Sequence, residues 1–253
     1  MAPALTYLEF HLALVVPPVA LLAWSLYRGG GGTFVARPRL AVAGTALMAL
    51  VAFVYTAPWD NYLISQGVWW YPDGVVLATV GHAPVGEYLF FVLQPVLTLL
   101  WLFHLRRDTT EEPAVNARGL GVLVWLGLTA AGNVLYTTTA GFYLGAILVW
   151  AAPVAALQWA VGGPHLWRVR RTLALAVAVP TAYLWLADRL AIGLGLWQFS
   201  PERTTGLAVL GLPVEEAVFF LMTNILVVQG VLLLYWVVES VADRSFVAAL
   251  SAR

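Results

Sequence analysis

The sequence predicts an all-α, polytopic membrane protein with seven transmembrane helices. Of its 253 residues, 61% are hydrophobic and only 10% are charged, which lies outside the composition of ordinary soluble domains. Apolar runs of bilayer-crossing length recur along the chain, and arginines gather in alternate connecting loops. A formal net charge of zero gives no indication of a nucleic-acid partner, and the lack of cysteine excludes disulfides and thiolate-bound metals.

The apolar runs give the expected positions of the spans, if about 20 mainly apolar residues make one helical crossing. The last run is longer than one crossing requires, so its first residues are expected to form a lead-in at the membrane interface. The helix itself is expected to begin near Pro213, because proline suits the first turn of a helix. The seven runs lie near residues 5–27, 40–57, 84–105, 119–137, 141–161, 172–192 and 207–238.

The arginines predict the orientation of the chain in the cell membrane. The second and fourth loops contain no arginine, and the sixth balances Arg189 and Arg203 with Asp188 and Glu202. Because basic loops stay on the cytoplasmic side, the N-terminus is expected outside and the C-terminus inside. The first, third and fifth loops carry Arg28, Arg37, Arg39, Arg106, Arg107, Arg118, Arg168, Arg170 and Arg171.

Three blocks of sequence recur in the same order, which predicts an internal duplication. "YLEFHLALVVPPVA" matches "YLGAILVWAAPVAA", "DNYLISQGVWWYP" matches "DRLAIGLGLWQFSP", and "PVGEYLFF" matches "PVEEAVFF". We therefore expect a first repeat at 1–110, a connector containing span four at 111–138, and a second repeat at 139–253. Equivalent spans run in the same direction, which predicts a pseudo-twofold axis along the membrane normal.

The third block places a glutamate at the start of two spans, Glu87 and Glu216. Each is followed at helical spacing by phenylalanines, and such a face is expected to look into the bundle, because ionisable groups in a span rarely meet lipid. Burial favours the neutral form of a carboxyl group, and a second carboxyl nearby favours it further. One of Glu87, Glu215 and Glu216 is therefore expected to hold a proton near neutral pH and to donate it to an electron-rich double bond.

Aromatic side chains are the candidates for stabilising the carbocation that such a proton transfer creates, by cation–π attraction. A paired carboxylate would then remove a proton, in the usual division between an acid and a base. The aromatic candidates are Trp69, Trp197, Phe90, Phe91, Phe219 and Phe220.

Structural interpretations of the same residues stay open at this point. Phe-Phe pairs and tryptophans in a membrane helix also occur as packing residues or at the membrane interface. A glutamate near a helix N-terminus also interacts favourably with the helix dipole. Asp60 and Asp188 fit either a cap or loop anchor or a place in the site. Glu9 fits either a site-lining or an interfacial position.

The motifs "TYLEFH", "PWDNYLISQGVWWYP", "GHAPVGEYLFF" and "LPVEEAVFF" resemble those of the membrane-integral lycopene cyclases of the archaeal, actinobacterial and fungal type. The resemblance covers about residues 5–240 and is to the fused form of an enzyme that also occurs as two small subunits. It implies β-cyclisation of the linear ψ ends of lycopene and other linear carotenoids in membrane lipid. The reaction is a non-redox isomerisation, with no cofactor and no metal.

The resemblance also implies roles for the glutamates. Glu216 and Glu87 would act as acid and base in either order, with Glu215 as a tuning neighbour or an alternative acid. Gly86 stands where the second half has Glu215, so the two halves are not expected to be catalytically equal.

Three other functions fit parts of the pattern. A retinal-binding photoreceptor requires a Schiff-base lysine, and all 13 basic residues of this chain are arginine. A small-solute transporter would use the repeat and the buried acids for proton coupling, although the scarcity of polar residues within the spans favours an apolar substrate. A membrane hydratase of related fold would deliver water to the same kind of cation.

Overall fold

Seven long helices make up most of the structure, a computed structural model that describes residues 5–111 and 116–251. Within these described ranges, seven helical segments are long and apolar enough to cross a membrane, which confirms the predicted number of spans and a multi-pass membrane protein. The segments are Tyr7–Tyr27, Pro38–Ser65, Val85–His104, Ala117–Tyr136, Phe142–Arg168, Arg170–Gly193 and Val214–Ala242.

The first span is built from three pieces: helix α1 (Tyr7–Phe10), a π-helical turn (His11–Val15) and helix α2 (Val16–Tyr27). Thr6 and Glu9 form a capping box that starts α1. The π turn lies just before Pro17 and Pro18. Because a proline removes one helical hydrogen bond and crowds the preceding turn, a local widening of the helix is a known way to accommodate it.

Two of the next helices are longer than the sequence predicts. After a 3₁₀ turn (Thr33–Ala36), α3 runs from Pro38 to Ser65 and passes through Pro58, so residues predicted to lie in a loop, including Asp60, are helical. Helix α6 (Phe142–Arg168) continues past the predicted end at 161 through a kink at Gly162. The remaining long helices are α4 (Val85–His104), α5 (Ala117–Tyr136), α7 (Arg170–Gly193) and α8 (Val214–Ser251).

Six two-residue strands form three small antiparallel pairs. Strands β2 (Thr79–Val80) and β3 (Ala83–Pro84) form a hairpin before α4, and β5 (Ala208–Val209) and β6 (Leu212–Pro213) form one before α8. The lead-in predicted before α8 is this second hairpin, and α8 begins directly after Pro213, as predicted. The third pair joins distant segments: Trp69 of β1 (Trp69–Trp70) pairs with Phe199 of β4 (Gln198–Phe199).

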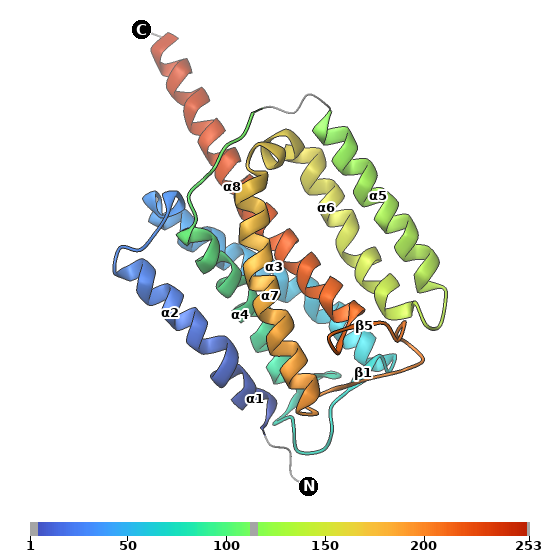
Figure 1. Ribbon diagram of the computed structural model, residues 1–253. Helices are drawn as coiled ribbons and strands as arrows, with labels where there is room; N and C mark the ends of the chain where they lie inside the picture. Colours follow the sequence, from blue (N-terminus) through green and yellow to red (C-terminus); the bar gives the residue numbers. More distant parts are fainter. Residues whose placement is uncertain (1–4, 112–115, 252–253) are drawn as a thin grey trace.

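The strands gather at one end of the bundle, the end at which the described chain begins (Figure 1). Helix α8 runs through the middle and is the most buried of the spans, whereas α5 lies at the periphery against α6. The C-terminal part of α8 extends from the opposite end of the bundle. The chain therefore enters and leaves at opposite ends, as seven crossings require.

The two loops that carry the strands share a backbone hydrogen-bond pattern. Val68 N donates to Leu63 O, and Leu196 N donates to Ala191 O at the matching position of the second loop. The Tyr7 amide donates to Val75 O, and the Tyr143 amide, its match in the predicted repeat, donates to Arg203 O. These parallels support the predicted duplication, which stays a prediction.

Helices α5 and α6 lie close together at Gly132 and Gly145, and we predict that this contact does not tolerate a side chain. A Cβ atom on Gly145 would lie 2.3 Å from Tyr136 N, and one on Gly132 would lie 2.6 Å from Leu148 Cβ. The substitution Gly145→Leu is expected to lower the stability by about 2 kcal/mol or more, because overpacking forces the helices apart. The melting temperature of the purified protein in detergent measures the effect.

Gly127→Leu is the control, because a Cβ atom on the exposed Gly127 of α5 meets nothing within 4 Å. Equal melting temperatures for the two variants would contradict the prediction.

Candidate active site

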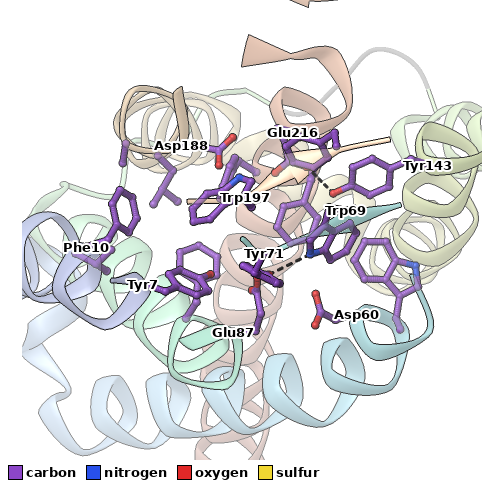
Figure 2. Close-up of a pocket in the computed structure, with 18 residues that line it drawn as sticks. Tyr7, Phe10, Asp60, Trp69, Tyr71, Glu87, Tyr143, Asp188, Trp197 and Glu216 are labelled. Carbon is purple, nitrogen blue, oxygen red and sulfur yellow. Dashed lines mark hydrogen bonds between the residues drawn. The ribbon is translucent and has the colours of Figure 1, made fainter. Parts of the chain in front are cut away.

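A cavity of about 620 Å³, part of it open space, lies at the strand-bearing end of the bundle, between helices of both predicted repeats (Figure 2). Four carboxyl groups line it, from Asp60, Glu87, Asp188 and Glu216. The rest of the wall is aromatic and aliphatic, from Tyr7, Phe10, Val15, Trp59, Trp69, Tyr71, Phe90, Tyr143, Leu184, Ala187, Trp197, Phe199, Phe219 and Phe220. We call this space the central cavity.

The four carboxyl groups share the cavity with no basic lining residue. Asp60, Asp188 and Glu216 are buried, and Glu87 is partly buried. Asp60 and Asp188 each lie close enough to Glu87 and Glu216 for their charges to interact. Four buried negative charges without a counter-charge would be very costly. The cavity therefore has to hold some of these groups in their protonated form, and this is what acid chemistry requires.

Glu87 is the acceptor of a directional hydrogen-bond chain. The indole Nε1 of Trp69 donates to the Tyr71 hydroxyl at 3.0 Å, and that hydroxyl donates to Glu87 Oε1. Since an indole N–H is only a donor, the Tyr71 oxygen receives from Trp69 and its own proton points to Glu87. Burial and the charge of Glu87 raise the pKa of Tyr71 well above its usual value, so the phenol keeps this proton. The Tyr7 hydroxyl also lies beside Glu87.

Glu216 has a different environment. Its Oε1 lies 2.6 Å from the Tyr143 hydroxyl, and this is the one hydrogen bond of that hydroxyl among the described residues. Because nothing else fixes the direction, Tyr143 can donate to a carboxylate or accept from a carboxylic acid. At the position that matches Tyr71, the second half has Phe199, which carries no hydroxyl group. Among the residues that the structure describes, the Trp–Tyr–Glu chain is therefore found around Glu87 and not around Glu216.

Asp60 and Asp188 both face the central cavity, which favours the site interpretation over a cap or loop anchor. Asp60 lies on α3 and Asp188 on α7, at matching positions of the predicted repeats. Asp60 Oδ2 and both carboxyl oxygens of Asp188 have no hydrogen bond of ordinary geometry in the described part of the chain. The indole of Trp197 lies beside Asp188 (Figure 2).

Glu215 lies outside the central cavity, although it is fully buried. Its Oε1 accepts from the backbone N and the side-chain hydroxyl of Thr205, each at 2.7 Å. It thus anchors the loop that leads into β5. In the first half Gly86 takes the matching position, where a Cβ atom would lie 2.5 Å from the ring of Tyr7. The departure from symmetry at this position therefore makes room for a tyrosine that reaches Glu87.

Two other expected residues also lie outside the central cavity. Glu9 is exposed, and its carboxylate accepts from the backbone N of Thr6 at 2.7 Å within the capping box, so the site-lining expectation for Glu9 is corrected. Phe91 is buried but lines a second, neighbouring pocket. Phe90, Phe219, Phe220, Trp69 and Trp197 do line the central cavity, as expected.

The aromatic rings stand at different angles around the carboxyl groups. Phe219 stacks on Trp59 with ring centres 5.8 Å apart, and Phe90 meets Phe220 edge to face at 6.0 Å. An aromatic ring face attracts a positive charge, by about 2 kcal/mol or more when the pair is desolvated. No cluster of three or more His, Asp or Glu side chains suited to a metal ion occurs among the described residues.

Three tyrosines that contact the glutamates were not among the site residues predicted from the sequence: Tyr7, Tyr71 and Tyr143. A signal for them was present, since all three lie in the recurring blocks, and Tyr7 and Tyr143 match each other. Phenols are the neutral donors that can meet a buried carboxyl group without adding charge. Tyrosines at recurring positions in a membrane protein with recurring glutamates therefore deserve to be counted with the acids.

The sequence matches one family of known proteins. The family model described as lycopene cyclase matches residues 7–105 and 133–235, two ranges that correspond closely to the two predicted repeats. A lycopene beta-cyclase of Halobacterium salinarum is 46% identical over 235 residues, which cover 92% of this chain and 97% of that protein.

Fungal relatives match over less of their own length. Bifunctional lycopene cyclase/phytoene synthases of Phaeosphaeria nodorum and Podospora anserina are each 36% identical to this chain. The matches cover 88% and 90% of this chain but only 40% of each fungal protein. No solved structure matches.

Proposed function

This chain belongs to the lycopene cyclase family, and we propose that it closes the linear ψ ends of lycopene into β-rings. The central cavity carries the proposal, because it combines four carboxyl groups with aromatic walls and has no basic lining residue. Such a site can supply a proton to an apolar polyene and can stabilise the positive charge that results.

The reaction needs one proton in and one proton out. A proton adds to the terminal double bond of the ψ end, which leaves a cation on the carbon that bears the two methyl groups. The neighbouring double bond attacks this carbon, a six-membered ring closes, and the charge moves onto a ring carbon. Loss of a proton from the adjacent carbon gives the β-ring. The substrate and the product are isomers, so no electrons are exchanged with a partner.

We assign Glu216 as the acid and Glu87 as the base. The Trp69–Tyr71 chain directs a phenolic proton at Glu87 and so supports its carboxylate form. Tyr143 has no second donor that would fix its direction, so it can accept from a protonated Glu216. Two carboxyl groups with unlike surroundings are the usual basis for dividing acid and base roles.

The aromatic residues are proposed to stabilise the cation between the two proton transfers. Trp69, Trp197, Phe90, Phe219 and Phe220 line the central cavity and support this role by their position. Phe91 lies in the neighbouring pocket, and we assign it a packing role. Glu215 is proposed to hold the loop before β5 through Thr205 rather than to exchange a proton with the substrate.

We further propose that the protein lies in the cell membrane as two parallel repeats with its N-terminus outside. The alternating arginines and the parallel loop geometry support this arrangement.

The orientation can be tested by labelling, because the chain has no cysteine of its own. Asp73→Cys, in the second loop, is expected to react with a membrane-impermeant maleimide on intact cells. Thr109→Cys, in the third loop, is expected to react only after the membrane is opened. The opposite result would reverse the proposed orientation, and equal labelling of both on intact cells would contradict the span assignment.

The function is tested by expression in a bacterium that accumulates lycopene, followed by chromatography of the pigments. We expect lycopene to be replaced by products with one and two β-rings. Hydroxylated acyclic products would indicate a hydratase instead. Unchanged lycopene beside abundant, membrane-inserted protein would refute cyclisation.

Removal of either glutamate is expected to reduce β-ring formation at least about 100-fold, the usual contribution of a general acid or base. With Glu216→Gln, the lycopene should stay unreacted, because no cation forms. With Glu87→Gln, traces of lycopene should still react and yield other end groups, because the cation forms but loses its proton elsewhere.

Glu215→Gln is the control and should retain most activity, since an amide oxygen can still accept from Thr205. Loss of activity in this variant with normal stability, or normal β-ring yield from Glu216→Gln, would overturn the assignment. In the second case Asp188 would be the next candidate acid.

A further inference from the structure

A second apolar pocket adjoins the central cavity. It measures about 730 Å³ including its open side, and α3, α4, α6 and α8 form its walls. Phe90 and Phe219 line both spaces, so these two rings are all that the pocket and the site of the carboxyl groups share as a wall. We call it the lateral slot, because Val51 of α3 lines it and is 49% exposed on the outer surface of the bundle.

One wall of the slot is a stack of flat rings that begins in the central cavity. Trp59, a cavity residue, stacks on Trp150 with ring centres 4.7 Å apart and planes 22° apart. Trp150 stacks in turn on Tyr55, at 5.3 Å and 18°, and both of these line the slot. A flat conjugated chain gains dispersion and stacking contacts along such a surface.

A matching pocket exists on the other side of the bundle, between α2, α4 and α7. Val179 and Tyr183 of α7 take the positions that Val51 and Tyr55 take on α3, and Tyr183 donates to Leu14 O as Tyr55 donates to Trp150 O. Unlike the slot, this counterpart pocket shares no lining residue with the central cavity.

The sequence explains why the two pockets differ. Trp101 lines the counterpart where the slot has Gly230, so the counterpart carries a large ring at a position where the slot has no side chain. Leu97, Leu184 and Phe220 are buried together between the counterpart and the cavity. The counterpart is therefore closed off from the carboxyl groups.

We propose that the lateral slot binds the conjugated chain of a linear carotenoid while one end of the molecule lies in the central cavity. The inference rests on the proposed function, which requires a long hydrocarbon with its end at the carboxyl groups. The slot lies between the central cavity and the exposed outer surface at Val51, and its aromatic wall fits a flat polyene that passes the shared rings of Phe90 and Phe219. Substrate then enters sideways from the bilayer between α3 and α6, and the counterpart pocket takes no part.

The repeat supplies a matched pair of variants. Val51 and Val179 are the same residue at matching positions, with exposed fractions of 49% and 43%, but only Val51 lines the slot. Val51→Trp is expected to lower the cyclisation rate of lycopene at limiting substrate about 10-fold or more, because the larger ring fills space in the slot that the polyene would occupy. Val179→Trp should stay within about 2-fold of the unchanged protein, as surface substitutions usually do.

A short analogue separates loss of binding from damage to the site. A molecule that keeps the acyclic end group but only the first few conjugated double bonds should reach the central cavity without filling the slot. Val51→Trp should therefore cyclise the analogue at the rate of the unchanged protein while it fails with lycopene. If the tryptophan variants do not accumulate in the membrane, Val51→Phe and Val179→Phe introduce a smaller ring and can be compared in the same way.

Equal effects of the two substitutions, or equal losses with lycopene and the short analogue, would overturn the inference. An unchanged protein that does not cyclise lycopene would instead refute the proposed function, so the two failures are distinguishable.

Discussion

The site depends on one electrostatic constraint: four carboxyl groups share a mainly apolar cavity that no basic side chain lines. In a soluble enzyme an arginine or a lysine would commonly compensate such charges, but here the neutral donors are phenols and indoles. This arrangement fits a reaction through a carbocation, because a fixed positive side chain in the cavity would repel the intermediate. Aromatic residues make up 13% of the chain. Tyrosine and tryptophan can donate hydrogen bonds to the acids, and all three aromatic types can attract a cation.

The two predicted repeats give their glutamates unlike surroundings. Glu87 and Glu216 occupy matching positions at the start of α4 and α8, but Tyr71 is matched by Phe199 and Gly86 by Glu215. The first difference gives Glu87 a directed donor, and the second makes room for the ring of Tyr7 beside it. These two differences between the predicted repeats support the proposed division between a proton donor and a proton acceptor.

Much of this could be predicted from the sequence, because apolar length, arginine placement and recurring blocks are local or periodic signals. The seven spans, the start of α8 near Pro213 and the presence of Glu87 and Glu216 in one cavity all follow from them. The extension of α3 through Pro58 could not be predicted, since tertiary packing overrode the helix-breaking tendency of proline. The position of Glu215 depends on a long-range contact with Thr205, whereas the role of Glu9 was readable in "TYLE", a capping-box pattern.

The short ladder between β1 and β4 has a consequence for the product. Trp69 and Phe199 are partners in this ladder and also line the central cavity, and Val68, Val75 and Leu196 are fully buried beside it. The two connecting loops thus form a cover that belongs to neither half alone. Water that reached the proposed carbocation would capture it and give an alcohol after loss of a proton, whereas a cover that excludes water would favour ring closure and deprotonation. Under the proposed reaction, the pairing of these two loops would therefore bear on whether the cation yields a cyclic hydrocarbon or an alcohol, because Trp69 and Phe199 line the same cavity as the glutamates.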